Sequence, residues 1–256
     1  MTPLEIYQFP YDIDDNYGVL LHSPDTGETA CIDGGIATTY QEALAEKGWQ
    51  LSHIFITHHH YDHVNGVVEL KENNNCKVIG PDYKGGGPIH GIDQYVKDGD
   101  RFEFAGHEVQ VLHTPGHTMD LICYYLPSMG IIFVGDTLFA MGCGKAFEGT
   151  AEMIWESLKK LHALPPETMI YCSHEYTQEN AAFALSVDPD NPDLQQRSRE
   201  VDELREQDIP TVPFSLATEL ATNPFLRADD AGIRKHLGMM DAAEVDVFVK
   251  IRELRG

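Results

Sequence analysis

Basic residues are scarce in this sequence: 18 Lys and Arg stand against 41 Asp and Glu, a formal net charge of −23 over 256 residues. Nucleic-acid binding depends mainly on Lys and Arg that displace counterions from phosphates, and attraction to an anionic membrane depends on the same side chains. The composition therefore argues against both as partners. An anionic small substrate would need a local cluster of basic residues to hold it.

Paired cysteines and long apolar runs are also lacking. No stretch approaches about 18 uninterrupted apolar residues, and the first residues show no basic segment followed by an apolar one. The cysteines are odd in number and without CxxC spacing, so neither a disulfide framework nor a thiolate zinc ribbon is indicated. We expect a cytoplasmic protein with reduced thiols, taken as a monomer although nothing in the sequence fixes the oligomeric state. The five cysteines are Cys31, Cys76, Cys123, Cys143 and Cys172.

What is present suffices for a large core, since hydrophobic residues make up 42% of the chain. Up to about residue 175, short β-rich segments alternate with loops and a few helical patterns, which indicates an α/β layered domain over residues 1–175. The expected helices are 38–48, 62–74 and 150–164. The expected strands are 17–22, 28–33, 53–57, 76–80, 107–113, 121–126, 130–135 and 169–174.

The pattern changes after residue 176. Segments 176–187, 194–207, 230–238 and 243–254 are helical in pattern, and no good strand candidate remains. Segments 187–193 and 209–216 are rich in proline and are expected to be connections. We therefore expect a smaller, mostly helical C-terminal domain over residues 176–256.

Histidine is concentrated in THHHYDH, residues 57–63, directly after an apolar run. In an extended segment, residues two apart point the same way, so His58 and His60 can face one metal ion while His59 faces away. Asp62 and His63 follow where the chain turns into a helix, and they could serve a second ion.

Two ligands are too few for a divalent site, so further donors are required downstream. His117 and Asp136 each follow a β-rich run, and His174 is the last residue of another. Taken singly, such a histidine is usually structural and such an aspartate usually caps a helix. A structural metal site is also possible, but structural zinc sites are mostly thiolate-rich. The cluster therefore favours a catalytic metal centre.

The THHHYDH segment resembles the THxHxDH signature of the metallo-β-lactamase superfamily. Within it, the chain is similar over nearly its full length to glyoxalase II, the hydroxyacylglutathione hydrolase family. The motifs that carry the resemblance are THHHYDHVNG (57–66), TPGHT (114–118), GDTLFAMGCGKAFEGT (135–150), SHEYTQEN (173–180) and NPFLR (223–227). It implies a metallo-β-lactamase-type αββα sandwich followed by a smaller helical C-terminal domain. It also implies hydrolysis of S-(2-hydroxyacyl)glutathione, such as S-lactoylglutathione, to glutathione and a 2-hydroxy acid, D-lactate, in methylglyoxal detoxification.

The resemblance further implies two divalent metal ions per chain, with Zn expected first and Fe or Mn as alternatives. Two such ions can share one water, lower its pKa and polarise a carbonyl oxygen. Asp62 and Asp136 are the expected catalytic carboxylates, and Asp62 is expected to ligate rather than to act as a lone base, because a carboxylate between two cations is strongly acidic. One ion is assigned to His58, His60 and His117, and the other to Asp62, His63 and His174, with Asp136 bridging.

Glutathione contacts are implied at Lys145, Phe147, Tyr176, Arg252 and Arg255, although a solvated surface role is the alternative for each cation. The chain departs from the family where Phe147 replaces a tyrosine and Arg255 a lysine. It departs again where Asp120 and Leu121 replace Gly and His after the TPGHT motif. Asp33 is either a support for the ligands or a turn residue before two glycines. The histidines expected to be ordinary are His53, His107, His113, His162 and His236.

Other functions compete with this interpretation. A mononuclear iron persulfide dioxygenase would not need Asp62 and His174 as ligands, while a lactonase or a phosphodiesterase could use the same donors. A nuclease is disfavoured by the acidity of the chain. A non-catalytic metal-binding protein with this fold would be expected to lack a ligand, and none is missing.

Overall fold

The computed structural model describes residues 2–11, 15–82 and 87–256, and the chain divides into two compact units. Unit 1 is formed by Met1–His113 and Thr118–Gly135, and unit 2 by Thr114–His117 and Asp136–Gly256. The short segment that carries His117 therefore groups with the later part of the chain.

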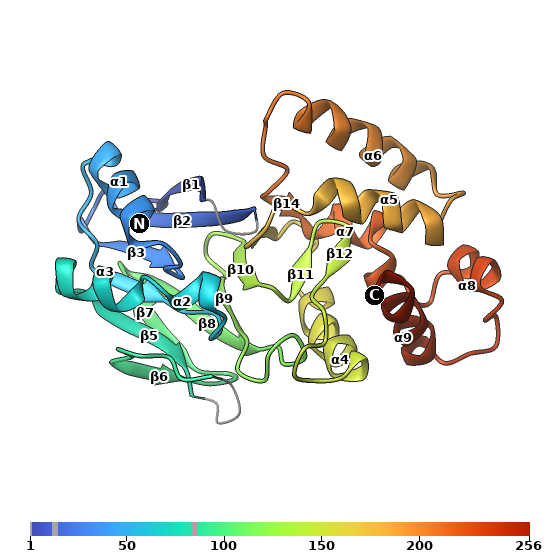
Figure 1. Ribbon diagram of the computed structural model, residues 1–256, viewed down its shortest axis with the longest axis horizontal. Helices are drawn as coiled ribbons and strands as arrows, with labels where there is room; N and C mark the ends of the chain where they lie inside the picture. The colour runs from blue at the N-terminus through green and yellow to red at the C-terminus, as the bar shows by residue number, and fades with distance from the viewer. Residues whose placement is uncertain (1, 12–14, 83–86) are drawn as a thin grey trace. The chain divides into compact units, whose positions relative to one another are not determined.

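A six-stranded sheet forms one layer of unit 1, with its strands in chain order from β1 to β6 (Figure 1). β1 to β3 are antiparallel, while β3 to β6 run parallel. Parallel neighbours need crossover connections, and helices form the first two of them. β1, which was not predicted, is an edge strand that tolerates Pro10. The strands are β1 (Glu5–Tyr11), β2 (Asn16–His22), β3 (Thr29–Ile32), β4 (His53–Phe55), β5 (Lys77–Pro81) and β6 (Gln94–Val96).

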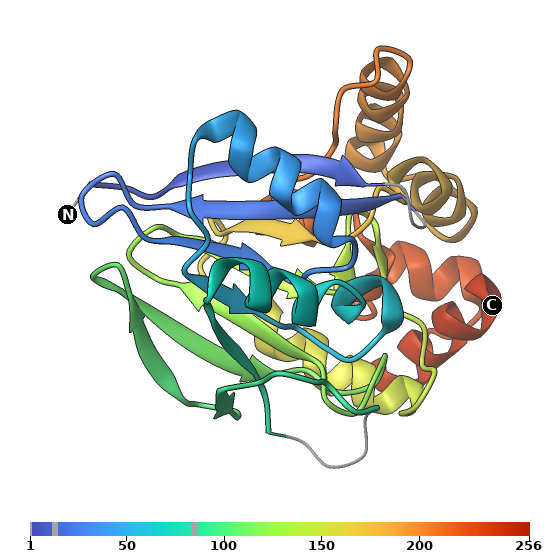
Figure 2. The ribbon, with the colours of Figure 1, turned by 60° about the vertical axis from the view of Figure 1, so that its left-hand side comes forward.

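Helices α1 and α3 cover one face of this sheet (Figure 2). Tyr40 and Leu70 are fully buried in the core beneath them. The single helix predicted at 62–74 is wrong, because the chain breaks into two helices around Gly66. A Cβ at Gly66 would lie 2.5 Å from the amide nitrogen of Ala37, so close packing excludes a side chain there. The helices are α1 (Ala37–Lys47), α2 (Tyr61–Val64) and α3 (Val67–Asn74).

The second sheet of unit 1 contains four antiparallel strands in the order β7, β8, β9 and β10. Aromatic side chains join the two sheets: the Phe55 ring lies 5.3 Å from Phe102 and 5.4 Å from both Phe104 and Tyr124. The Tyr124 hydroxyl donates to the Ile56 carbonyl at 2.7 Å. These strands are β7 (Arg101–Phe104), β8 (His107–His113), β9 (Ile122–Leu126) and β10 (Ile131–Gly135).

Unit 2 contains a short hairpin, a helix and a two-stranded pairing. The hairpin joins β11 (Leu138–Phe139) to β12 (Gly142–Cys143). α4 (Ala151–His162) starts at Thr150, whose side chain accepts from the Met153 amide, and buries Ile154 and Leu158. β13 (Met169–Cys172) pairs with β14 (Phe214–Ser215), so the expectation that no strand follows residue 176 is wrong.

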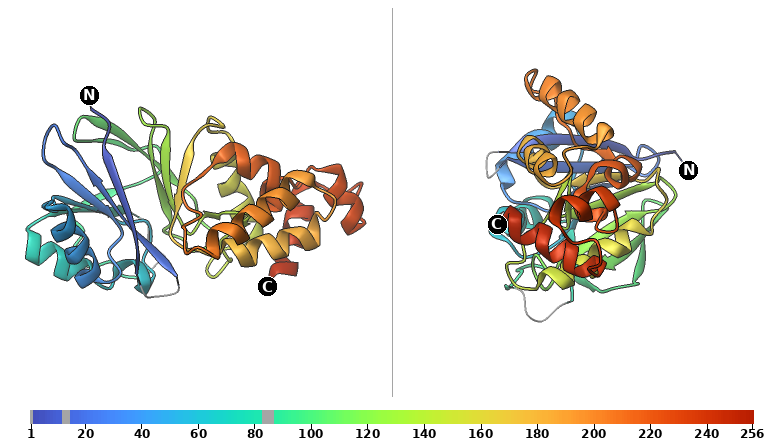
Figure 3. Two further views of the ribbon diagram at one scale, coloured as in Figure 1. Left: turned by 90° about the horizontal axis from the view of Figure 1, so that it is seen from above. Right: turned by 90° about the vertical axis from the view of Figure 1, so that its right-hand side faces the viewer.

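The remainder of unit 2 is helical, and the four predicted C-terminal helices are confirmed. α5 and α6 lie side by side around a core that includes Ala184 and Leu194 (Figure 3). α9 packs against α4 through Trp155 and Phe248, whose ring centroids are 5.4 Å apart. None of the described helices is long and apolar enough to cross a membrane. The elements are α5 (Thr177–Val187), α6 (Pro192–Arg205), α7 (Leu216–Thr222), η1 (Pro224–Leu226), α8 (Ala231–Leu237) and α9 (Glu244–Arg255).

Candidate metal centre

The loop between β4 and α2 brings the histidines of unit 1 together. His58 and His63 are fully buried, with ring centroids 4.0 Å apart, and the His60 ring lies 4.8 Å from that of His58. Asp62 Oδ2 is 3.1 Å from His63 Nε2. Four of the expected ligands thus lie around one short loop.

Asp33 supports this loop from the end of β3. Its carboxylate accepts from the Thr57 amide at 2.7 Å and the Thr57 hydroxyl at 2.8 Å, and it lies 2.8 Å from His63 Nδ1. A carboxylate at Nδ1 holds the proton there and leaves the lone pair of His63 on Nε2. Asp33 also has φ 57° before two glycines, so it is a turn residue that also contacts His63, an expected ligand.

His59 points to a different partner. Its Nδ1 lies 2.9 Å from Oδ1 of Asp120, whose side chain is buried. Asp120 stands in the segment that departs from the family pattern. The departure thus places a buried carboxylate directly on the loop of residues 56–60, which carries the expected ligands His58 and His60.

The other three expected ligands lie together in unit 2. Asp136, directly after β10, has Oδ2 3.3 Å from His117 Nε2 and 3.2 Å from His174 Nε2. All three side chains are buried. His117 Nδ1 donates to the Lys145 carbonyl at 3.0 Å, which leaves Nε2 with the lone pair.

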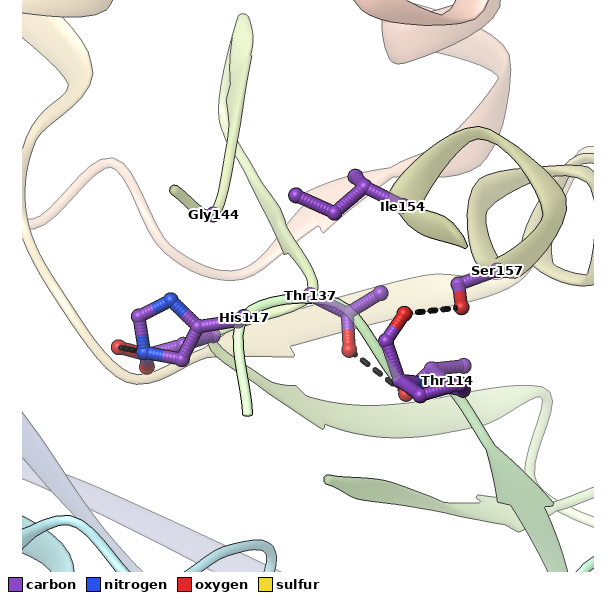
Figure 4. Close-up of a pocket in the computed structure, with 8 residues that line it drawn as sticks. Thr114, His117, Thr137, Gly144, Ile154 and Ser157 are labelled. Atoms are coloured by element: carbon purple, nitrogen blue, oxygen red, sulfur yellow. Dashed lines mark hydrogen bonds and ion pairs between the residues drawn. The ribbon is translucent and has the colours of Figure 1, made fainter. Parts of the chain in front are cut away.

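His117 and Asp136 line a narrow crevice in unit 2 (Figure 4). Beside them, the hydroxyls of Thr114 and Thr137 are hydrogen-bonded at 2.8 Å, and the Ser157 hydroxyl donates to the Pro115 carbonyl at 2.7 Å. These bonds fix the segment before His117 to α4 and to the segment after β10. Thr137 and Ser157 were not singled out from the sequence, since a hydroxyl side chain alone gives no signal of such a role.

The donor geometry fits a metal ion in both units. Two ligand atoms about 2.1 Å from one ion, at tetrahedral or octahedral angles, lie about 3.0 to 3.4 Å apart. The pairs Asp62–His63, His117–Asp136 and His174–Asp136 have separations of 3.1, 3.3 and 3.2 Å. All seven expected ligands belong to His and Asp clusters able to bind a metal ion.

His113, the other histidine near TPGHT, belongs to unit 1 and makes a different contact. Its Nε2 lies 2.9 Å from the Met119 carbonyl. Because a carbonyl can only accept, this nitrogen carries the proton and its lone pair is not available to a metal.

Three of the five expected substrate contacts share a pocket of about 250 Å³ in unit 2. Lys145 is exposed, and Phe147 is 65% exposed with its ring edge-on to His117 at 5.2 Å. Arg252 is buried, and its guanidinium donates to the carbonyls of Cys143 and Gly144. The pocket is lined by Lys145, Ala146, Phe147, Ala151, Val249, Arg252, Glu253 and Gly256.

The other two expected contacts are outside this lining. Tyr176 stacks on His174, with ring centroids 4.7 Å apart and an interplanar angle of 7°. Arg255 is 3.3 Å from the Glu179 carboxylate. Tyr176 therefore contacts an expected ligand, whereas the charge of Arg255 is partly balanced by an acidic neighbour.

The thiol of Cys143 lies 3.6 Å from Nη1 of Arg252, which lines the pocket. Burial raises the pKa of Cys143 to about 11, although the Arg252 guanidinium acts in the opposite direction. Near neutral pH the thiol is therefore protonated, which is its less nucleophilic form.

Comparisons with known proteins agree with this geometry. Residues 16–174 match the model of the metallo-beta-lactamase superfamily, and residues 175–256 match that of the hydroxyacylglutathione hydrolase C-terminus. Hydroxyacylglutathione hydrolases of Brucella ovis and Brucella melitensis are each 50% identical over 250 residues, which cover 98% of this chain and 96% of the relative.

Solved structures show the same fold at lower identity. ETHE1 from Myxococcus xanthus aligns with a TM-score of 0.70 at 24% identity, covering 97% of this chain and 90% of that chain. TTHA1623 in a di-iron-bound form aligns with a TM-score of 0.63 at 22% identity, covering 86% of this chain and 100% of that chain. The expected fold, an α/β metallo-β-lactamase domain followed by a helical C-terminal domain, is confirmed.

Proposed function

Because the chain belongs to the hydroxyacylglutathione hydrolase family, we propose that it hydrolyses S-(2-hydroxyacyl)glutathione, including S-lactoylglutathione, to glutathione and the 2-hydroxy acid. The observation that carries this proposal is 50% identity over 98% of the chain to relatives of that name. The role that follows is removal of the thioester formed during methylglyoxal detoxification.

The metal centre of this proposal contains two divalent ions. His58, His60 and His117 would hold one, Asp62, His63 and His174 would hold the other, and Asp136 would be shared between them. The support is the donor chemistry, since imidazole and carboxylate suit Zn, Fe and Mn, together with the nitrogen and oxygen separations within each unit. Two divalent ions held in this way would lower the pKa of a water and polarise a carbonyl oxygen.

The protein's own groups fix the donors before substrate arrives. Asn16, fully buried, donates from Nδ2 to Asp62 Oδ2 at 3.0 Å. The Tyr11 hydroxyl donates to the Asp62 carbonyl at 2.9 Å. Asp62 is therefore an oriented ligand rather than a mobile general base. In hydrolysis, the acyl carbon gains the water oxygen and the C–S bond breaks with its electron pair on sulfur. The thiolate leaves without prior protonation and takes up one proton of the water afterwards, while the other proton is released to solvent and the acid product is a carboxylate.

The carrier is held in this proposal by the pocket of unit 2. Glutathione has carboxylates, and Lys145 and Arg252 supply local positive charge in a chain of net charge −23. Phe147 adds an apolar wall, and Tyr176 and Arg255 complete the proposed contacts. In this assignment residues 1–175 form the catalytic domain and residues 176–256 the substrate-binding domain.

We assign the enzyme to the cytoplasm, as a monomer acting on a small-molecule substrate rather than on nucleic acid or a membrane. Support comes from the five buried, free cysteines, which suit a reducing compartment.

One combined experiment tests the function. Metal analysis of the purified protein is followed by thioesterase assays with lactoylglutathione and with lactoyl esters of other thiols. We expect close to two metal ions per chain, a preference for the glutathione thioester, and loss of activity on prolonged chelation. One iron per chain with oxygen uptake would instead indicate a dioxygenase, and full activity in metal-free protein would exclude the proposed chemistry.

A further inference from the structure

A buried acidic network in unit 2 takes no part in the proposed chemistry. Glu219 on α7 is completely buried, and its Oε1 lies 2.6 Å from Arg197 Nη1 on α6. Its Oε2 accepts from the Met141 amide at 2.9 Å and from Asn223 Nδ2 at 2.8 Å. Removing a carboxylate from water is costly, and a buried ion pair adds little net stability. This network is therefore better explained by the backbone segment that it holds in place.

The segment held by this buried network is the β11–β12 hairpin. Met141, at the turn, has φ 54°, a strained left-handed conformation for a side chain of this size. Asn223 Nδ2 lies within hydrogen-bond distance of the carbonyls of Phe139 (3.3 Å) and Gly142 (3.0 Å). Side chains from the C-terminal helices thus hold the turn by its backbone.

A second set of contacts holds the turn from α5. Asn180 donates to the Ala140 carbonyl at 3.1 Å. A Cβ on Gly142 would lie 2.5 Å from Asn180 Nδ2, so this contact leaves no room for a side chain on the hairpin. The hairpin is therefore placed by helices that are distant in the sequence.

The far end of the same hairpin meets two expected metal ligands. A Cβ on Gly144 would lie 2.1 Å from the Asp136 carbonyl oxygen and 3.2 Å from His117. The next residue, Lys145, accepts from His117 Nδ1 through its carbonyl and lines the pocket with its side chain. One short segment thus orients a ligand ring and places the cation of the proposed carrier site.

We propose that Glu219, with Arg197 and Asn223, is a positioning group that fixes the 138–145 hairpin and, through the Lys145 carbonyl, the imidazole of His117. The inference rests on the proposed function, because it assigns to these residues both the affinity for the glutathione thioester and the retention of the ion bound by His117. Glu219 itself would contact neither the thioester nor the ion.

The test compares Glu219→Gln with Asp188→Asn, both in the Zn²⁺-loaded enzyme. Asp188 is a matched control: it is also buried and paired with an arginine, Arg227, but its partners are not in the hairpin. The measurements are the melting temperature, KM and kcat for lactoylglutathione, and the rate at which a chromogenic chelator removes Zn²⁺ in the absence of substrate.

We expect both variants to melt at lower temperature. Only Glu219→Gln should raise KM and speed the loss of Zn²⁺, each by about tenfold, because loss of support for a ligand commonly weakens metal binding by that factor or more. Asp188→Asn should stay within about twofold of the unmodified enzyme in both. A Glu219→Gln enzyme that differs only in melting temperature would overturn the inference.

If Glu219→Gln does not fold, a second variant tests the same inference. Asn223→Ser keeps a hydroxyl that can cap η1 at the Phe225 amide but is too short to reach the hairpin carbonyls. It should show the same two effects, and unchanged KM and Zn²⁺ loss would overturn the inference. Failure of the proposed function is distinct, because the unmodified enzyme would then lack bound metal or thioesterase activity altogether.

Discussion

At the scale of single residues, the Asp136 carboxylate contacts two expected ligands, His117 and His174. We predict that Asp136→Ala lowers kcat by at least about a hundredfold, since loss of a metal contact removes stabilisation of the transition state. His113→Ala should have a much smaller effect, because its Nε2 is bonded to the Met119 carbonyl. Steady-state kinetics and metal analysis on both variants check this. Severe and equal metal loss in the two would show that the wrong histidine was assigned.

Lys145 supplies an exposed cation at the pocket. We predict that Lys145→Ala raises KM about tenfold to a hundredfold with kcat largely unchanged, because a charge-assisted hydrogen bond contributes about 1.5 to 3 kcal/mol. Added salt should weaken binding to the unmodified enzyme more than to the variant. Kinetics at two ionic strengths measure both effects. An unchanged KM would mean that the carrier is held elsewhere.

At the scale of elements, the break between α2 and α3 places His63. The Gly34 amide donates to the His63 carbonyl at 2.7 Å, and the Gly66 amide donates to the Gly34 carbonyl at 2.8 Å. The His63 backbone in α2 and the start of α3 are therefore held by the same β3–α1 turn. A continuous helix over 62–74 would lose this arrangement.

We predict that Gly66→Ala destabilises the fold by about 1 to 3 kcal/mol, because the added methyl meets backbone that cannot move freely. It should also reduce the metal content, through displacement of the His63 backbone. Glu72→Ala on the exposed face of α3 is the control and should change stability by less than about 0.5 kcal/mol. Urea unfolding and metal analysis of the variants test this prediction. Equal free energies of unfolding for Gly66→Ala and the unmodified protein would show that the turn accommodates the added methyl group.

For the whole molecule, buried thiols and phenols set an upper limit to the pH range in which the fold is most stable. Burial raises the pKa of Cys31, Tyr40, Tyr124 and Cys172, and that of Cys143 to about 11. A thiol that ionises near pH 9 when unfolded binds its proton more tightly in the fold. Its stabilising effect is complete below about pH 9 and is lost as the pH rises toward 11.

We therefore predict that the free energy of unfolding falls between pH 9 and 11, with Cys143 accounting for about 2 to 3 kcal/mol of the loss. Urea unfolding at several pH values measures this. Cys143→Ala should show a shallower decrease than the unmodified protein. Parallel curves for the two would indicate that Cys143 titrates normally.

The sequence by itself determined most elements and the kinds of donor at their ends. Apolar periodicity placed the strand β8 and the helix α4 within a few residues, because burial of one face is a local pattern. The run from His58 to His63 and the donors at Asp136 and His174 were recognisable for the same reason: each directly follows or ends an apolar β-rich run.

Only the tertiary structure decided which groups support these donors. Asp33 and His63 are 30 residues apart, and Glu219 and Met141 are 78 apart. The break at Gly66 depends on the approach of Ala37, and β14 exists because Phe214 pairs with Ile170. Hydrogen bonds and close backbone contacts of this kind form between segments that the chain brings together only on folding, so no local periodicity encodes them.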